Sequence, residues 1–78
     1  MRKNQFGITR MNLEHLKTFH VVGSLGSFTE AAKALYMTQP AVSQQIQGIE
    51  HALRNPLFDR SKRQIRLTAK GKILFSYT

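Results

Sequence analysis

Cysteine and tryptophan are absent from this 78-residue sequence, which also has only two prolines and four acidic residues. Without cysteine no disulfide can form, and because this fits a reducing compartment we expect a cytoplasmic protein. No apolar run reaches the roughly 18 residues that a membrane-spanning helix needs. The basic start MRKNQFGITR leads into no apolar segment, so we do not expect a secretory signal. This length allows one small domain with a modest core.

Groups suited to catalysis or metal binding are scarce as well. The histidines, His15, His20 and His51, lack the spacing of metal ligands, and no cysteine can complete a site. No glycine-rich phosphate loop is present. Each of the four carboxylates has a capping or surface role available. We therefore expect no enzyme, no metal and no cofactor.

Positive charge is abundant and unevenly distributed. The chain has 12 lysines and arginines and a net charge of +8. Most of this excess lies in residues 1–10 and 60–78, whereas residues 11–59 are close to neutral. This asymmetry favours a polyanionic partner, with nucleic acid ahead of a membrane surface. The alternative is that the two basic ends are simply solvated.

Capping signals predict the first two helices. The first should begin at Asn12, a good N-cap, and end at residues 23–26. The second should begin after Ser27, with Glu30 completing a capping box. Apolar residues at helical spacing should face inward along the first three helices. They are Leu13, Leu16, Phe19, Val22, Phe28, Ala31, Ala32, Leu35, Val42, Ile46, Ile49 and Leu53.

A third helix should follow Thr38, its expected N-cap. Pro40 suits the first turn, where a missing N–H costs little. The helix should end before the Asn-Pro pair at residues 55–56. Gly48, inside it, weakens the helix by roughly 1 kcal/mol relative to alanine, and we attribute it to close packing.

The period of the apolar residues changes from helical to alternating after this helix. LFDR and QIRLT are expected to form short strands joined by the polar turn SKRQ. Thr68 should then cap a last helix in AKGKILFSYT.

This order of elements predicts a mainly α winged helix-turn-helix with a three-helix core and a two-stranded wing, followed by a linker or dimerisation helix. In this fold the second helix of the pair enters the DNA major groove. We expect residues 1–10 to be a flexible extension and residues 11–67 to be the DNA-binding domain. Residues 68–78 would begin the linker helix.

The polar face at the start of the third helix is almost uncharged, and it carries Gln39, Pro40, Ala41, Ser43 and Gln44. Glutamine can pair with the N6 and N7 atoms of adenine, serine can bond to several base edges, and proline or alanine can touch a thymine methyl. Phosphate contacts would fall to the wing cations and to helix N-termini. The face therefore suits base reading in double-stranded DNA.

Residues 11 to about 75 resemble the DNA-binding domain of LysR-type transcriptional regulators. The segments GSFTEAAKALYMTQPAVSQQI, IEHAL, PLFDR and LTAKG occur in the order typical of that family. The resemblance implies a bacterial transcription factor that binds interrupted inverted repeats as a homodimer or a dimer of dimers. It also implies a location in the cytoplasm, at the nucleoid when the protein is bound to DNA.

The resemblance also assigns residues. The base-contacting positions of the family match Gln39, Pro40, Ala41, Ser43 and Gln44, and the wing-tip position that enters the minor groove matches Arg63. Contacts to the DNA backbone are expected from residues at helix starts and in the wing, namely Ser27, Thr29, Thr38, Lys62 and Arg66. Gln44 departs from the arginine of many members, which should shift the site from guanine toward adenine.

Two further departures concern the ends of the chain. Residues 1–10 precede the usual family start, which matches Met11. No effector-binding domain follows Thr78, so we expect a fragment on which a small-molecule effector would act only through the missing domain. An apolar stripe in the last helix, Ile73, Leu74 and Tyr77, is expected to mediate dimerisation rather than to pack within its own chain.

Other interpretations remain open from the sequence. The wing cations Arg60, Lys62, Arg63 and Arg66 could be solvated, and Arg60 could instead pair with Asp59 or a helix end. The amide face could bind a protein partner. The net charge alone could coat nucleic acid without sequence preference.

Overall fold

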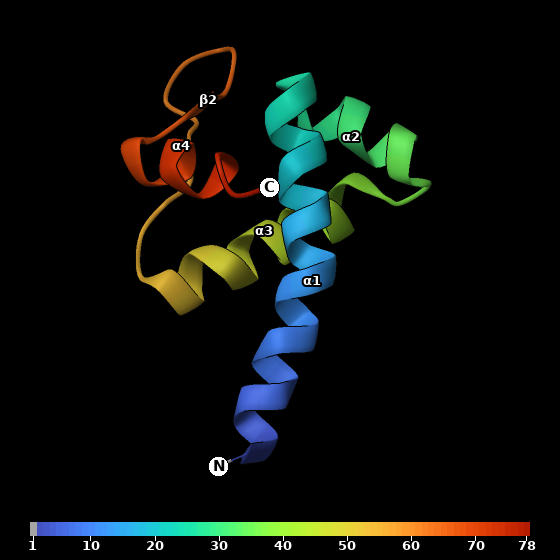
Figure 1. Cartoon of the computed structure of the whole chain (residues 1–78). Coiled ribbons are helices and arrows are strands. Elements are labelled where there is room, and N and C mark those ends of the chain that lie inside the picture. Colours follow the sequence, from blue (N-terminus) through green and yellow to red (C-terminus); the bar gives the residue numbers. More distant parts are fainter. Residues whose placement is uncertain (1) are drawn as a thin grey trace.

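The computed structural model describes the backbone of residues 2–78 and the side chains of residues 13–78. Along the chain the elements are α1 (Arg2–Leu25), α2 (Phe28–Leu35), α3 (Gln39–Leu53), β1 (Phe58–Asp59), β2 (Arg66–Leu67) and α4 (Ala69–Phe75). In Figure 1 the second half of α1 lies at the centre, with α2 on one side and the hairpin and α4 on the other. No helix in the described part of the chain combines the length and apolar content needed to cross a membrane.

Three helices and the start of the hairpin share one core. The side chains of Phe19, Val22, Val42, Ile46 and Leu57 are fully buried. Phe19 packs against Phe58 with ring centroids 5.4 Å apart. Burial of such side chains supplies most of the favourable free energy of folding in a small domain. The observed architecture is the predicted winged helix-turn-helix, with α2 and α3 as the helix pair.

Three residues expected to face inward lie outside this core, and one of them, Leu16, is half-buried beside a surface hollow. Leu13 is 67% exposed and Leu53 is 48% exposed, so both predictions were wrong. Leu13 instead lines a surface hollow together with Lys17 and Tyr77. Leu53 is the last residue of α3, where the chain turns away at Arg54.

The start of α1 also differs from the prediction. The helix is continuous from Arg2, so Asn12 lies inside it and is not its N-cap. No proline interrupts residues 2–12, and a single glycine is tolerated inside a helix at a cost of roughly 1 kcal/mol. The flexibility expected for residues 1–10 stays a prediction, because a helical backbone does not test it.

The other predicted caps are confirmed. The Ser27 hydroxyl accepts a hydrogen bond from the Glu30 N–H (3.0 Å), and the Thr38 hydroxyl accepts from the Ala41 N–H (3.2 Å). Only half of the expected capping box forms, because the Glu30 carboxylate pairs with Lys33 instead (3.4 Å). These caps fix where α2 and α3 begin.

The hairpin is present but shorter than expected. The strands pair antiparallel, with Phe58 opposite Leu67 and Asp59 opposite Arg66. Each strand has two residues, so residues 60–65 form the wing tip. Residues 60–64 of the tip are exposed and polar, whereas Ile65 is half-buried and packs against the core.

Candidate nucleic-acid interface

The amide-rich face at the start of α3 is accessible. Gln39, Pro40 and Gln44 are exposed, and Ala41 and Ser43 are half-buried. Among the described side chains, none donates to or accepts a hydrogen bond from the side chains of Gln39, Ser43 or Gln44. Because the opposite face of α3 is buried in the core, these groups are held on a rigid helix with their hydrogen-bonding capacity unused.

A buried polar contact ties α3 to α1. Thr18 is only 4% exposed. Its hydroxyl donates to the side-chain oxygen of Gln45 (2.5 Å) and also lies 3.3 Å from the carbonyl oxygen of Glu14. Gln45 therefore belongs to the fold rather than to the reading face. Sequence analysis did not assign this role, because the partner lies 27 residues away.

Hydroxyl groups lie at the starts of both helices of the pair. The Ser27 and Thr38 oxygens accept capping bonds, which leaves their hydroxyl hydrogens available to donate. Thr29 is exposed in the first turn of α2. The three residues expected to contact phosphates are thus placed at helix N-termini, where the helix dipole also favours an anion.

The wing presents unpaired cations. Lys62, Arg63 and Arg66 are exposed, and none forms an ion pair with a described carboxylate. Asp59 instead shapes the start of the turn, accepting hydrogen bonds from the backbone N–H (3.0 Å) and hydroxyl (2.7 Å) of Ser61. These two bonds, followed by the charges of Lys62 and Arg66, hold the pKa of the exposed Asp59 carboxyl below 3.8.

Arg60 differs from the other wing cations. Its guanidinium lies 3.8 Å from Glu50 and stacks over the Phe28 ring at 4.6 Å from the centroid. It therefore pairs with Glu50 on α3 rather than with Asp59. Because this position joins α2, α3 and the wing, Arg60 serves the fold.

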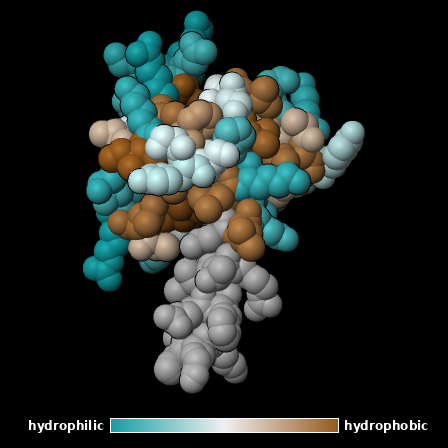
Figure 2. All heavy atoms as spheres, in the orientation of Figure 1, coloured by the Kyte–Doolittle hydropathy of each residue, from teal (hydrophilic) through white to brown (hydrophobic). Residues whose placement is uncertain are grey.

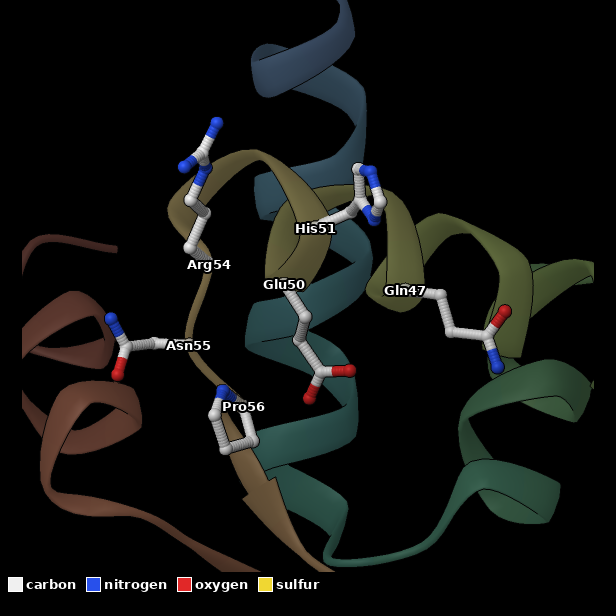
Figure 3. Close-up of a pocket in the computed structure, with 6 residues that line it drawn as sticks. All are labelled: Gln47, Glu50, His51, Arg54, Asn55 and Pro56. Carbon is white, nitrogen blue, oxygen red and sulfur yellow. The ribbon is translucent and has the colours of Figure 1, made fainter.

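Glu50 is the most consequential residue that sequence analysis did not single out. Its side chain is 17% exposed, and it accepts hydrogen bonds from the backbone N–H groups of Leu57 (2.8 Å) and Phe58 (3.4 Å). In Figure 3 its carboxylate points toward the segment around Pro56, while His51 and Arg54 point away from it. Glu50 thus anchors the first strand of the wing to the end of α3.

The second end of the wing is anchored by Thr68. Its hydroxyl donates to the carbonyl oxygen of Pro56 (2.7 Å) and accepts from the Gly71 N–H (3.0 Å). Its own N–H donates to the carbonyl oxygen of Leu57 (2.9 Å). The start and the end of the hairpin are therefore joined at its base.

The helix ends on either side of the reading face have unusual backbone conformations. Tyr36 ends α2 with φ 57°, and Arg54 ends α3 with φ 56°. In the left-handed region a residue with a Cβ costs roughly 1–2 kcal/mol more than glycine. Nothing in the sequence signalled these conformations, because the residues that favour them are glycine and asparagine.

The stripe expected to mediate dimerisation is divided in the structure. Leu74 is half-buried and packs against the core of its own chain. Ile73 is 57% exposed and Tyr77, beyond the end of α4, is 82% exposed. On the face that Figure 2 shows, apolar side chains are spread across the middle of the molecule among polar ones. Tyr77 lines two surface hollows, one with Leu13 and the other with Leu53 and Ile73.

Residues 13–72 match the sequence model of a family described as "Bacterial regulatory helix-turn-helix protein, lysR family". A probable RuBisCO transcriptional regulator of Cyanidioschyzon merolae is 49% identical over 65 residues, which cover 83% of this chain and 22% of that protein. An uncharacterized HTH-type transcriptional regulator of Azotobacter vinelandii is 47% identical over 64 residues, which cover 82% of this chain and 44% of that protein. The chain thus spans less than half the length of both curated relatives.

Solved structures agree with these relatives. The DNA-binding domain of BenM in complex with benA site 1 DNA superposes with a TM-score of 0.81 at 38% identity, covering 83% of this chain and 73% of that one. Vibrio fischeri DarR in complex with DNA superposes with a TM-score of 0.77 at 33% identity, covering 81% of this chain and 22% of that one. The chain belongs to the LysR family of bacterial regulatory helix-turn-helix proteins and carries the DNA-binding domain of such a transcriptional regulator.

Proposed function

We propose that this domain binds double-stranded DNA sequence-specifically as a homodimer, with α3 in the major groove and the wing at the flanking minor groove. The observation that carries the proposal is that two surfaces suited to DNA occur on the same domain. One is the amide and hydroxyl face of α3 with unused hydrogen bonds, and the other is the wing with its unpaired cations. As a LysR-family DNA-binding domain, the chain is a regulatory module and not an enzyme.

Base reading is assigned to the exposed start of α3. Gln39 and Gln44 offer both a donor and an acceptor to an adenine edge, and Ser43 can donate or accept. Pro40 and Ala41 offer apolar contact to a thymine methyl. Because Gln44 cannot reproduce the bidentate pairing of arginine with guanine, the preferred site should be rich in A·T pairs at its position.

Positioning on the backbone is assigned to the surrounding groups. Ser27, Thr29 and Thr38 would donate hydroxyl hydrogens to phosphates, and Lys62 and Arg66 would neutralise phosphates beside the wing. Arg63, at the wing tip, would enter the minor groove, where a narrow A·T-rich segment attracts arginine.

Pairing of two copies would run through the exposed apolar side chains at the end of the chain, mainly Ile73 and Tyr77. A two-fold dimer presents two α3 helices to half-sites about one helical turn of DNA apart. This arrangement accounts for an interrupted inverted repeat. We propose residues 11–67 as the DNA-binding unit and residues 68–78 as the start of the linker helix.

Family membership also supports the proposals that dimers pair into dimers of dimers, that an effector-binding domain controls such a regulator, and that it acts at the nucleoid of the cytoplasm.

Selection of duplexes from a random library at about 0.15 M salt tests the proposal, because screening at that ionic strength suppresses loose electrostatic contacts. Enrichment of an interrupted inverted repeat is the expected result. Enrichment of single half-sites would overturn the dimer. Binding that enriches no sequence and weakens equally on all duplexes as salt rises would instead indicate charge-driven coating.

A further inference from the structure

Tyr36 is a bulky residue at a position where the fold requires only a backbone conformation, because the N–H groups of Tyr36 and Met37 donate to the last carbonyl groups of α2. Its side chain is 96% exposed, and its backbone has φ 57° in the left-handed region that favours glycine and asparagine. Among the described residues it forms no side-chain hydrogen bond, aromatic pair or cation–π contact. A bulky residue at such a position is expected to have a reason beyond the stability of the monomer.

The other left-handed residue shows what a structural reason looks like. Arg54 ends α3, and a cationic residue is favourable at the C-terminus of a helix. Tyr36 is neutral and ends α2, so this explanation does not apply to it. A contact outside the chain would account for it.

The position of Tyr36 suggests what that is. It lies two residues before Thr38, the N-cap of α3, and three before Gln39, the first residue of the reading helix. We propose that the Tyr36 hydroxyl donates a hydrogen bond to a DNA phosphate beside the groove that α3 enters. This inference rests on the proposed function, and it adds a contact that neither the wing nor the helix caps provide.

A neutral phosphate contact has a distinctive signature. Affinity should fall by a similar factor on all duplexes, because phosphates carry no sequence information. The slope of affinity against salt should not change, because a hydroxyl releases no counterions when it replaces water at a phosphate. A lysine or arginine contact would change that slope.

Two variants distinguish the effect of the Tyr36 hydroxyl from the effect of its left-handed backbone conformation. Tyr36→Phe removes only the hydroxyl, whereas Tyr36→Asn also relieves the left-handed conformation. Affinities would be measured on the duplex selected by the unmodified chain and on a scrambled duplex, at several salt concentrations, together with melting temperatures. We expect both variants to bind both duplexes about five- to tenfold more weakly with unchanged salt slopes. Tyr36→Phe should melt like the unmodified chain, and Tyr36→Asn should melt higher.

The outcomes distinguish this inference from the proposed function. If the unmodified chain selects no sequence, the proposed function fails. If the unmodified chain selects a sequence and both variants bind it as tightly as the unmodified chain does, DNA binding stands and the Tyr36 contact is excluded. A protein partner would then be left for this side chain. A loss confined to the selected duplex would also overturn the inference, because it would indicate base reading rather than a phosphate contact.

Discussion

Gly48 and Gly71 both lie inside helices of this domain, and the space around them differs. A Cβ added at Gly48 would meet the His15 ring at 3.5 Å, which is an ordinary van der Waals contact. We expect Gly48→Ala to raise the free energy of unfolding by up to about 1 kcal/mol, because alanine is the better helix former. Urea unfolding followed by circular dichroism measures it.

Gly71 is the matched comparison. A Cβ there would overlap the carbonyl oxygen of Leu57, which is backbone and cannot move aside. Gly71→Ala should cost about 3 kcal/mol or more, as expected of overpacking. Equal effects at the two positions would contradict the packing described here.

A second residue-scale prediction concerns base reading. Gln39→Ala should weaken binding to the selected duplex by about 1–3 kcal/mol and relax the preference at one base pair. Gln47→Ala is the comparison, because Gln47 is exposed two turns further along α3, beside the hollow of Figure 3, and is expected to face solvent rather than a base. Repeating the duplex selection with each variant measures the change. A preference unchanged by Gln39→Ala would remove this residue from the reading set.

Asp59 gives a prediction about pH. Its pKa is lower in the folded chain than the ordinary 3.8, because Ser61 donates two hydrogen bonds to the charged form. The unfolded chain therefore takes up the proton first as pH falls, so the stabilisation is complete above pH 3.8 and decreases below it. In Asp59→Asn the amide oxygen can still accept. The amide is uncharged, so Asp59→Asn should melt at a lower temperature than the unmodified chain at neutral pH, and this difference should shrink in acid. A difference independent of pH would contradict this assignment.

At the scale of elements, the wing depends on Glu50. Glu50→Ala would leave the N–H groups of Leu57 and Phe58 without their acceptor, which should cost about 1–3 kcal/mol. Glu50→Gln retains an acceptor oxygen and loses only the ion pair with the partly exposed Arg60, so its cost should be under about 1 kcal/mol. Denaturant unfolding of both variants measures this difference. Equal costs would mean that the ion pair, and not the backbone contact, anchors the wing.

The same elements show what sequence could predict. Ser27, Thr38 and Thr68 were assigned correctly as N-caps, because the capping signal lies within four residues of each. The apolar period placed Phe19, Val22, Val42, Ile46 and Ile49 in the core for a similar reason, since each helix carries its own pattern.

Interactions between distant segments could not be predicted in this way. Glu50 with Leu57 and Thr18 with Gln45 bring together residues that no local pattern connects. Tyr36 and Arg54 adopt a conformation that their side chains disfavour, so composition pointed away from it. The reading face was predictable as a set of residues, whereas the contacts that hold it in place were not.

At the scale of the whole molecule, the exposed apolar surface near the end of the chain predicts self-association. Ile73→Glu should leave the fold intact, because Ile73 is 57% exposed, and should shift a dimer toward monomer by placing a charge in an apolar interface. Ala34→Glu, at an exposed position on α2, is the control for the added charge. Sedimentation velocity with and without the selected duplex measures the outcome. An unchanged dimer in Ile73→Glu would place the interface elsewhere.

The joined base of the wing has a consequence for how such regulators diverge. Thr68 and Glu50 hold both ends of the hairpin, so closure of the loop does not depend on its tip. Residues 62–64 are exposed, and no described side chain hydrogen-bonds to theirs. Mutations in these residues can accumulate, or the segment can be replaced by that of another regulator, without a cost to folding. Residues 62–64 are thus a part of the molecule in which operator preference can evolve while the scaffold stays the same.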